Sequence, residues 1–225
     1  MISATSFLDA FGRFVDQGNN LSADSWKNND HWLKAVIGPA SAASTGSPLG
    51  DCLVEKMGAG LRYRTEEWKI DLVLSTHRNA VRQDIKTDRM ELLPGFQPVL
   101  YDILIESENS IGISHEEMLK LVCMRARLKV LITYTFDSDG SGPREERASS
   151  AIDHARDQFD RVIDESNARY AENQETEYVF VVGRLISANG DSRARIEWTG
   201  FLRNVRGKFE PAGSLNSDEK GSHGS

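Results

Sequence analysis

The stretch from residue 101 to residue 110 decides the fold, and it reads Tyr101-Asp-Ile-Leu-Ile-Glu106-Ser-Glu108-Asn-Ser110. Its apolar core predicts a buried strand, in which successive side chains point to opposite faces. Glu106 and Glu108 therefore share one face where the strand ends. Hard divalent cations such as Mg2+ bind oxygen ligands and are usually held by one or two carboxylates. The stretch thus predicts a strand that presents an acidic pair suited to such a cation.

Another carboxylate, Asp71, interrupts an apolar strand upstream, at about residues 68–76. Strand alternation places Asp71 and Val73 on one face, and Leu72 and Leu74 on the other. Burying a lone carboxylate costs several kcal/mol unless a cation, hydrogen bonds or water compensate for it. Asp71 is therefore a second candidate site residue.

The residues after Glu108 predict a helix followed by a strand. Ser114 and Glu117 have the spacing of a capping box, which indicates a helix that begins at this point. The apolar run from Leu128 to Tyr134 predicts a central strand. A strand, helix, strand unit normally makes its two strands parallel through a right-handed crossover.

Apolar spacing predicts the remaining elements. Helices are expected in the N-terminal region around Phe7–Val15 and Trp26–Ile37, in a short segment around Leu49–Met57 that Gly58 and Gly60 end, and in a long segment around Ala151–Ile163. Strands are expected at about residues 61–66, 68–76, 98–107, 128–134, 178–187 and 195–202, the last two joined by a hairpin-like turn at residues 189–191. The polar insertion from Arg78 to Leu93 is rich in arginine and lysine, which is typical of a loop that faces nucleic acid.

Together these elements predict a mixed α/β (α+β) fold. We expect a mixed central β-sheet flanked by helices, with N-terminal helices before it and a C-terminal helix and β-hairpin after it. Residues 1–210 are expected to form a single domain. Residues 211–225 contain mainly glycine, serine and charged side chains, so they are expected to be disordered.

Composition and charge narrow the class of protein. The chain has 225 residues, of which 39% are hydrophobic and 27% charged, as in ordinary soluble globular proteins. No apolar run approaches the roughly 20 residues that span a membrane. The N-terminus lacks the pattern of a secretory signal, so we expect a cytoplasmic protein without a membrane partner. Neither cysteine, Cys52 or Cys123, lies in a C-x-x-C pair or at zinc-ligand spacing.

The net charge of −7 argues against a protein that coats nucleic acid without specificity, because that mode needs a strong positive field. Local basic clusters are nevertheless present. They comprise Arg62, Arg64 and Lys69; Arg78, Arg82, Lys86 and Arg89; and Arg193, Arg195, Arg203, Arg206 and Lys208. Each cluster is compatible either with phosphate contacts or with a solvated surface balanced by neighbouring carboxylates.

The order helix, three strands, helix, strand over about residues 48–136 resembles the PD-(D/E)xK superfamily, also called restriction-endonuclease-like nucleases. The resemblance rests on Asp71 in the second strand and on Glu106-x-Glu108 in the third. It implies a restriction-endonuclease-like core in which Asp71, Glu106 and Glu55 hold Mg2+ or Mn2+. It also implies hydrolysis of DNA phosphodiesters, with DNA as partner. Cleavage of both strands of a duplex would favour a homodimer.

The chain departs from the family pattern at two positions. Glu108 stands where the family has a lysine that helps to activate water, and Ile70 stands where the family has proline. Glu108 could itself act as a base, because a bound cation would keep it ionised. Alternatively, Lys120 on the next helix, or Lys69, could replace the family lysine, although an exposed lysine on a helix flank is the ordinary interpretation of Lys120.

Three functions therefore stay open on the sequence. The first is an active metal-dependent nuclease, with Asp71, Glu106, Glu108 and Lys120 as catalytic candidates. The second is a nuclease-like scaffold that no longer cuts and binds nucleic acid or a protein partner. The third is an unrelated α+β interaction domain in which Asp71 and Glu106 pair with arginines. Metal binding and phosphodiester cleavage distinguish the three.

Overall fold

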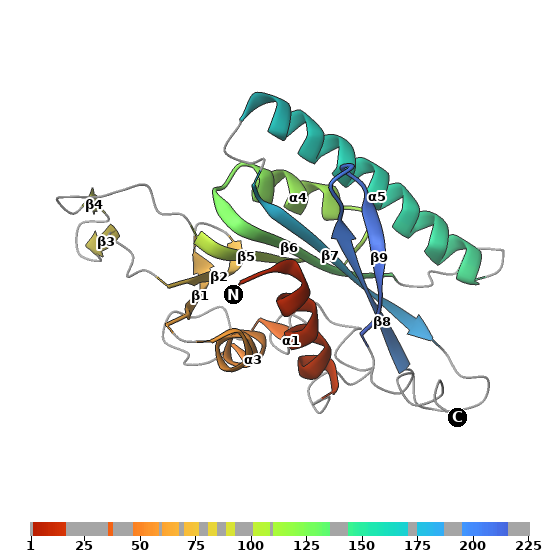
Figure 1. Ribbon diagram of the computed structural model, residues 1–225, viewed down its shortest axis with the longest axis horizontal. Helices are drawn as coiled ribbons and strands as arrows, with labels where there is room; N and C mark the ends of the chain where they lie inside the picture. The colour runs from red at the N-terminus through yellow and green to blue at the C-terminus, as the bar shows by residue number, and fades with distance from the viewer. Residues whose placement is uncertain are drawn as a thin grey trace.

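The computed structural model describes residues 2–16, 36–37, 47–58, 60–67, 70–76, 81–84, 89–92, 101–108, 110–135, 144–170, 175–186 and 195–215. Its helices are α1 (Ala4–Asp16), α3 (Pro48–Met57), α4 (Ser114–Val122) and α5 (Arg144–Arg169). Its strands are β1 (Arg62–Glu67), β2 (Ile70–Ser75), β3 (Val81–Asp84), β4 (Arg89–Leu92), β5 (Tyr101–Glu108), β6 (Ala126–Thr135), β7 (Glu177–Ile186), β8 (Arg195–Arg203) and β9 (Phe209–Ser214). Figure 1 shows a sheet between two layers of helices, with α4 and α5 on one side and α1 and α3 on the other.

The main sheet has seven strands in the order β1-β2-β5-β6-β7-β8-β9. Strands β5, β6 and β7 are parallel, whereas the other neighbours are antiparallel. Strands β3 and β4 form a separate antiparallel pair inside the insertion between β2 and β5. The predicted mixed α/β fold is confirmed at this level, including the parallel β5-α4-β6 unit, the long α5 helix and the antiparallel pairing of β7 with β8.

Side-chain alternation divides the core into two clusters, one on each face of the sheet. Leu72 and Leu74 belong to the cluster that α1 and α3 cover. Val73 belongs to the cluster that α4 and α5 cover. Strand β6 lies between two parallel neighbours, and its side chains are buried on both faces, as is typical of a central parallel strand.

Aromatic side chains pack the helices onto the sheet. On the α5 face, the Phe159 ring meets the Phe180 ring edge to face, with centroids 4.9 Å apart. On the opposite face, Phe11 of α1 meets Trp198 edge to face at 5.2 Å. Full burial of such a side chain contributes roughly 1.5–3 kcal/mol to stability, so these contacts hold both helical layers in place.

The prediction that the chain is disordered from residue 211 onward is wrong for residues 211–214. These residues complete strand β9, which pairs with β8, and Phe209 at its start is fully buried. The Leu215 N–H then donates to the Trp198 carbonyl at 2.9 Å. Pro211 is compatible with this position because β9 is an edge strand, where a missing N–H need not break a ladder. Residues 216–225 lie outside the described residues.

The predicted capping box at the start of α4 is also wrong. Ile113 is the N-cap residue, and no side chain caps the helix. Ser114 is already helical, and its buried hydroxyl donates to the Ile111 carbonyl at 2.7 Å. Glu117 is therefore not used as a cap, and its carboxylate is available for contacts in the site described below.

Some predictions fall outside the described residues. They include most of the second N-terminal helix, of which only Val36 and Ile37 are described, together with Lys69 and the turn at residues 189–191. Within the described ranges, no helix is long and apolar enough to cross a membrane.

Candidate functional site

Asp71 and Glu106 meet where β2 and β5 lie side by side. The register of these strands places Leu72 opposite Ile105, so Asp71 and Glu106 are the next opposite pair. The Ser107 N–H donates to Asp71 Oδ2 at 2.7 Å, and the Asp71 N–H donates to Glu106 Oε2 at 3.4 Å. Each carboxyl group thus accepts a backbone hydrogen bond at the point where the two strands separate.

Glu106 is more deeply buried than Asp71, with 1% of its surface exposed. Its Oε1 atom is inaccessible to solvent and has no hydrogen-bond partner among the described residues. The Lys120 ammonium lies 3.7 Å from that oxygen and also pairs with Glu117. Lys120 keeps 44% of its side chain exposed, so it connects the buried pair to solvent. We call Asp71, Glu106, Glu117 and Lys120 the acidic cluster.

The acidic cluster contains three carboxyl groups and a single lysine. Burial, followed by the charges of Asp71 and Glu117, raises the pKa of Glu106 to about 10, although Lys120 opposes the rise. Glu106 therefore holds a proton near neutral pH when no other cation is present. Burial would lower the pKa of Lys120, but its contacts with Glu117 and Glu106 outweigh burial and raise it. The acidic cluster therefore has more carboxyl groups than the single charge of Lys120 can neutralise.

Sequence reasoning missed Glu117 because it assigned that residue to a helix cap. The signal was nonetheless present in the spacing of Glu117 and Lys120, which lie three residues apart and so share one side of α4. The parallel β5-α4-β6 unit returns the first turns of α4 over the end of β5. That geometry brings both side chains to Glu106.

Glu108 makes different contacts from those predicted for a water-activating residue. Its Oε1 accepts a hydrogen bond from the Ser110 N–H at 3.0 Å. Burial, and then the charge of Glu108, raises the pKa of the Tyr134 phenol. Glu108 is not among the groups that shift the pKa of Glu106, whereas Lys120 is. The structure therefore brings Lys120, rather than Glu108, to the buried pair.

Glu55 lies apart from the other predicted ligands. Its side chain is 64% exposed and forms an ion pair with Lys56. Helix α3 packs through Leu49 and Leu53 into the cluster that contains Leu72, whereas Asp71 alternates to the opposite face of β2. The structure does not bring Glu55 together with Asp71.

The donor set can be tested against a divalent cation. Among the residues that the structure describes, no group of three or more His, Cys, Asp or Glu side chains is arranged to hold a metal ion. Magnesium, however, is commonly held by one or two carboxylates, with water and substrate phosphate in its other positions. The buried Glu106 Oε1, without a hydrogen-bond donor, is an acceptor that a cation would satisfy. Asp71 and Glu106 therefore fit a hard cation, provided that the Lys120 ammonium moves aside.

The fold and the site together define a mixed α/β protein with a buried acidic pair at the separation of two neighbouring strands. Comparison of the chain with protein-family models, with curated proteins and with solved structures finds no match. Because a fold alone does not determine a function, the function must be argued from the chemistry of the site.

Proposed function

We propose that the protein is a metal-dependent nuclease that hydrolyses DNA phosphodiester bonds. The observation that carries this proposal is the convergence of Asp71 and Glu106 from adjacent strands, beside Lys120, in a group with an excess of acid. The element order α3, β1, β2, β5, α4, β6 supports it, because this is the order on which the resemblance to PD-(D/E)xK nucleases rests. The hairpin β3–β4 is an insertion between β2 and β5.

In this proposal, Asp71 and Glu106 provide the oxygen ligands for Mg2+ or Mn2+. Such a cation neutralises charge on the scissile phosphate and lowers the pKa of a bound water. Glu106 must lose its proton to act as a ligand, and Asp71, held by the Ser107 N–H, stays oriented toward it. Lys120 is long, half-exposed and close to Glu106, so it can contact the substrate phosphate or orient the attacking water.

Two arginines at the edge of the sheet beside the site support a nucleic-acid backbone as the substrate. Arg62 and Arg64 of β1 are exposed. The register places Arg64 opposite Val73, which shares a face of β2 with Asp71. Two arginines at this edge would meet phosphates on either side of the bond that lies at the acidic cluster.

Calorimetric titration of Mn2+ tests the metal site. Wild-type protein should bind Mn2+, and both Asp71→Asn and Glu106→Gln should reduce the affinity at least about tenfold, since each removes a charged ligand. Glu116→Gln is the matched control, because Glu116 is an exposed carboxylate on the same helix as Glu117. Absence of Mn2+ binding, both alone and with a duplex oligonucleotide that could supply phosphate ligands, would overturn the proposal.

A cleavage assay on single-stranded and duplex DNA tests the chemistry. We expect cleavage that requires Mg2+ or Mn2+ and that is lost in Asp71→Asn. Lys120→Met should retain the metal but lose most of the cleavage, whereas Glu108→Gln should retain more of it, because Glu108 contacts Ser110 rather than Glu106. If Glu108→Gln instead loses more cleavage than Lys120→Met, then Glu108 is the residue that activates water.

A second candidate is a nuclease-like scaffold that binds nucleic acid or a protein partner without cutting. Its support is that oxygens of Asp71 and Glu106 already accept backbone N–H groups while Lys120 partly neutralises the pair. In such a protein the carboxyl groups complete the hydrogen bonding of two separating strands. DNA binding that survives both Asp71→Asn and chelation of metal, with no cleavage under any condition, would favour this candidate.

A further inference from the structure

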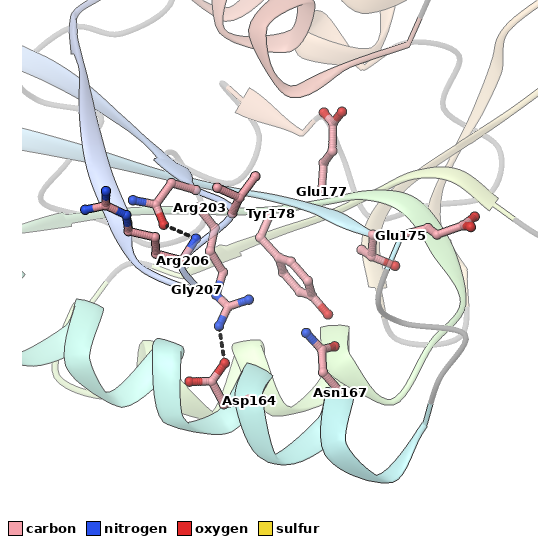
Figure 2. A pocket seen from close by; sticks show the side chains of 11 residues that line it. Asp164, Asn167, Glu175, Glu177, Tyr178, Arg203, Arg206 and Gly207 are labelled. Atoms are coloured by element: carbon pink, nitrogen blue, oxygen red, sulfur yellow. Dashed lines mark hydrogen bonds and ion pairs between the residues drawn. The ribbon is translucent and has the colours of Figure 1, made fainter.

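A polar pocket lies on the α5 side of the sheet, two strands away from Glu106. It has a volume of about 490 Å3, and it is lined by the C-terminal part of α5, the start of β7 and the turn between β8 and β9. Figure 2 shows the Tyr178 side chain pointing from β7 toward Asn167 on α5. Binding pockets for small ligands commonly measure about 300–1,000 Å3, so this one has sufficient room.

Within the described part of the chain, three polar atoms of the residues that line the pocket are buried and lack a hydrogen-bond partner: the Tyr178 hydroxyl, Asn167 Oδ1 and Arg203 Nε. Tyr178 is 2% exposed, and neither its hydroxyl nor Asn167 Oδ1 has a hydrogen-bond partner among the described residues. Burial raises the pKa of Tyr178 to about 12, so the phenol stays protonated and can donate. The Lys129 ammonium lies 5.4 Å from the centre of the Tyr178 ring and so helps to fix the ring. Unpaired buried polar groups are costly, and a ligand or water that pairs them is favoured.

Among the charged side chains that line the pocket, Arg203 and Asp164 pair with each other. Arg203 forms ion pairs with Asp164 and with the buried Asp160. Glu177 accepts a hydrogen bond from the Ala4 N–H and points away from Tyr178, as Figure 2 shows. Tyr178 and Asn167 are themselves uncharged, and Asp164 and Asp160 balance the charge of Arg203 beside them, which favours a neutral ligand over a phosphate or a metal ion at this pair.

We propose that this pocket binds a neutral ligand with an amide-like edge, in which a carbonyl acceptor lies beside an N–H donor, as in a pyrimidine or purine base. The Tyr178 hydroxyl donates to the carbonyl, and Asn167 accepts from the N–H. An exchange of the Asn167 oxygen and nitrogen leaves the match intact, because a carboxamide carries both a donor and an acceptor and the phenol can take either role.

Uracil is a suitable probe, and 1,3-dimethyluracil is its control, because methylation removes both N–H donors and leaves the carbonyls. We expect saturable uracil binding in calorimetry or in ligand-observed NMR, and binding of dimethyluracil that is at least about tenfold weaker. Orotate, which adds a carboxylate to the same ring, should also bind more weakly than uracil. None of these measurements uses metal or DNA, so their outcome is independent of the nuclease proposal.

Two variants locate the probe. Tyr178→Phe removes only the hydroxyl, and Asn167→Leu removes the carboxamide while keeping its size. Each should weaken uracil binding about tenfold or more, whereas Arg206→Ala, an exposed residue on the same rim, should change it little. Circular dichroism confirms that each variant is folded. Failure of uracil to bind, or binding that both Tyr178→Phe and Asn167→Leu leave unchanged, would overturn the proposal and indicate a pocket filled by water alone.

Discussion

Two buried carboxyl groups on the same side of the sheet, those of Glu106 and Asp160, differ in the charges that surround them. Glu106 is 1% exposed and shares its surroundings with Asp71, Glu117 and a single cation, Lys120. Asp160 on α5 is 2% exposed. Its neighbours are the cations Arg203 and Lys208, at 3.6 Å and 3.2 Å from its two oxygens, and the carboxylate Asp164, which also pairs with Arg203.

The difference separates a structural ion network from a candidate binding site. Around Asp160, the number of cations equals the number of carboxylates, so no external ion is needed. Around Glu106, carboxyl groups outnumber cations, so the charges of Asp71 and Glu117 add to the effect of burial, which is the largest cause of the raised pKa of Glu106. Burial also raises the pKa of Asp160, but Lys208 and Arg203 oppose that rise. An uncompensated buried acid is the arrangement that calls for a proton or a metal ion.

The largest effect is expected from breaking the balanced network. Arg203→Met leaves Asp160 buried with only Lys208, so we expect a loss of about 3 kcal/mol in the free energy of unfolding, measured by urea denaturation. Arg206→Met, an exposed residue on the turn that follows β8, should change stability by less than about 0.5 kcal/mol. Equal effects of the two variants would mean that the network around Asp160 does not contribute to stability.

The second largest effect is the pH dependence that Glu106 gives to the free energy of unfolding. Its pKa is raised above its ordinary value of 4.5, so the folded state binds the proton more tightly than the unfolded state does. Stability should therefore be greatest below about pH 4.5 as far as this group is concerned, and should fall as pH rises toward the raised pKa. The slope is at most about 1.4 kcal/mol per pH unit, because one group is involved.

Urea denaturation between about pH 5 and about pH 8 measures this effect. Glu106→Gln cannot ionise, so wild-type protein should lose stability relative to this variant as pH rises. Added Mn2+ should reverse the loss in wild-type protein only. Asp160→Asn is the comparison, and its difference from wild type should depend less on pH, because cations oppose the rise in the pKa of Asp160. Parallel pH profiles for wild type and Glu106→Gln would contradict the electrostatic description of the acidic cluster.

A smaller effect is expected from Lys120, which stands near the oxygen that a metal would use. Lys120→Met removes the competing ammonium 3.7 Å from Glu106 Oε1, so Mn2+ affinity should rise about fivefold, corresponding to about 1 kcal/mol. Lys56→Met, on the other face of the sheet, should leave Mn2+ affinity unchanged. Weaker Mn2+ binding in Lys120→Met would mean that the lysine orders the cluster rather than competing with the metal.

The sequence predicted the fold well where periodicity and burial act locally. The alternation through Leu72, Val73 and Leu74, and the apolar run of β6, are enough to place strands and faces. The end of the chain was harder to predict, because residues 211–214 have little apolar character. They form β9 through backbone pairing with β8, which is a tertiary contact that composition does not reveal.

The candidate site was predictable only in part, for a similar reason. The convergence of Asp71 and Glu106 followed from two strands with buried carboxylates. Lys120 was already a candidate from the sequence, and its spacing from Glu117 places the two on one side of α4. Whether that side faces Glu106 depends on how α4 crosses β5, which the residue pattern does not determine. Glu117 also fitted a capping box at the level of sequence, and only the position of the helix start, one residue earlier at Ile113, removes that interpretation.

The smallest effect is expected from Glu55, and it sharpens the distinction between an exposed acid and a buried one. Glu55 is exposed and paired with Lys56, on the face of the sheet opposite the acidic cluster. Glu55→Gln should therefore leave the Mn2+ affinity and the cleavage rate at wild-type values, whereas Glu117→Gln, which removes a carboxylate that acts on Glu106, should lower the affinity several-fold. Calorimetry on the two variants under the same conditions makes the comparison. A loss of metal binding in Glu55→Gln would show that α3 moves toward Asp71 when the cation binds, and that the family ligand set applies in full.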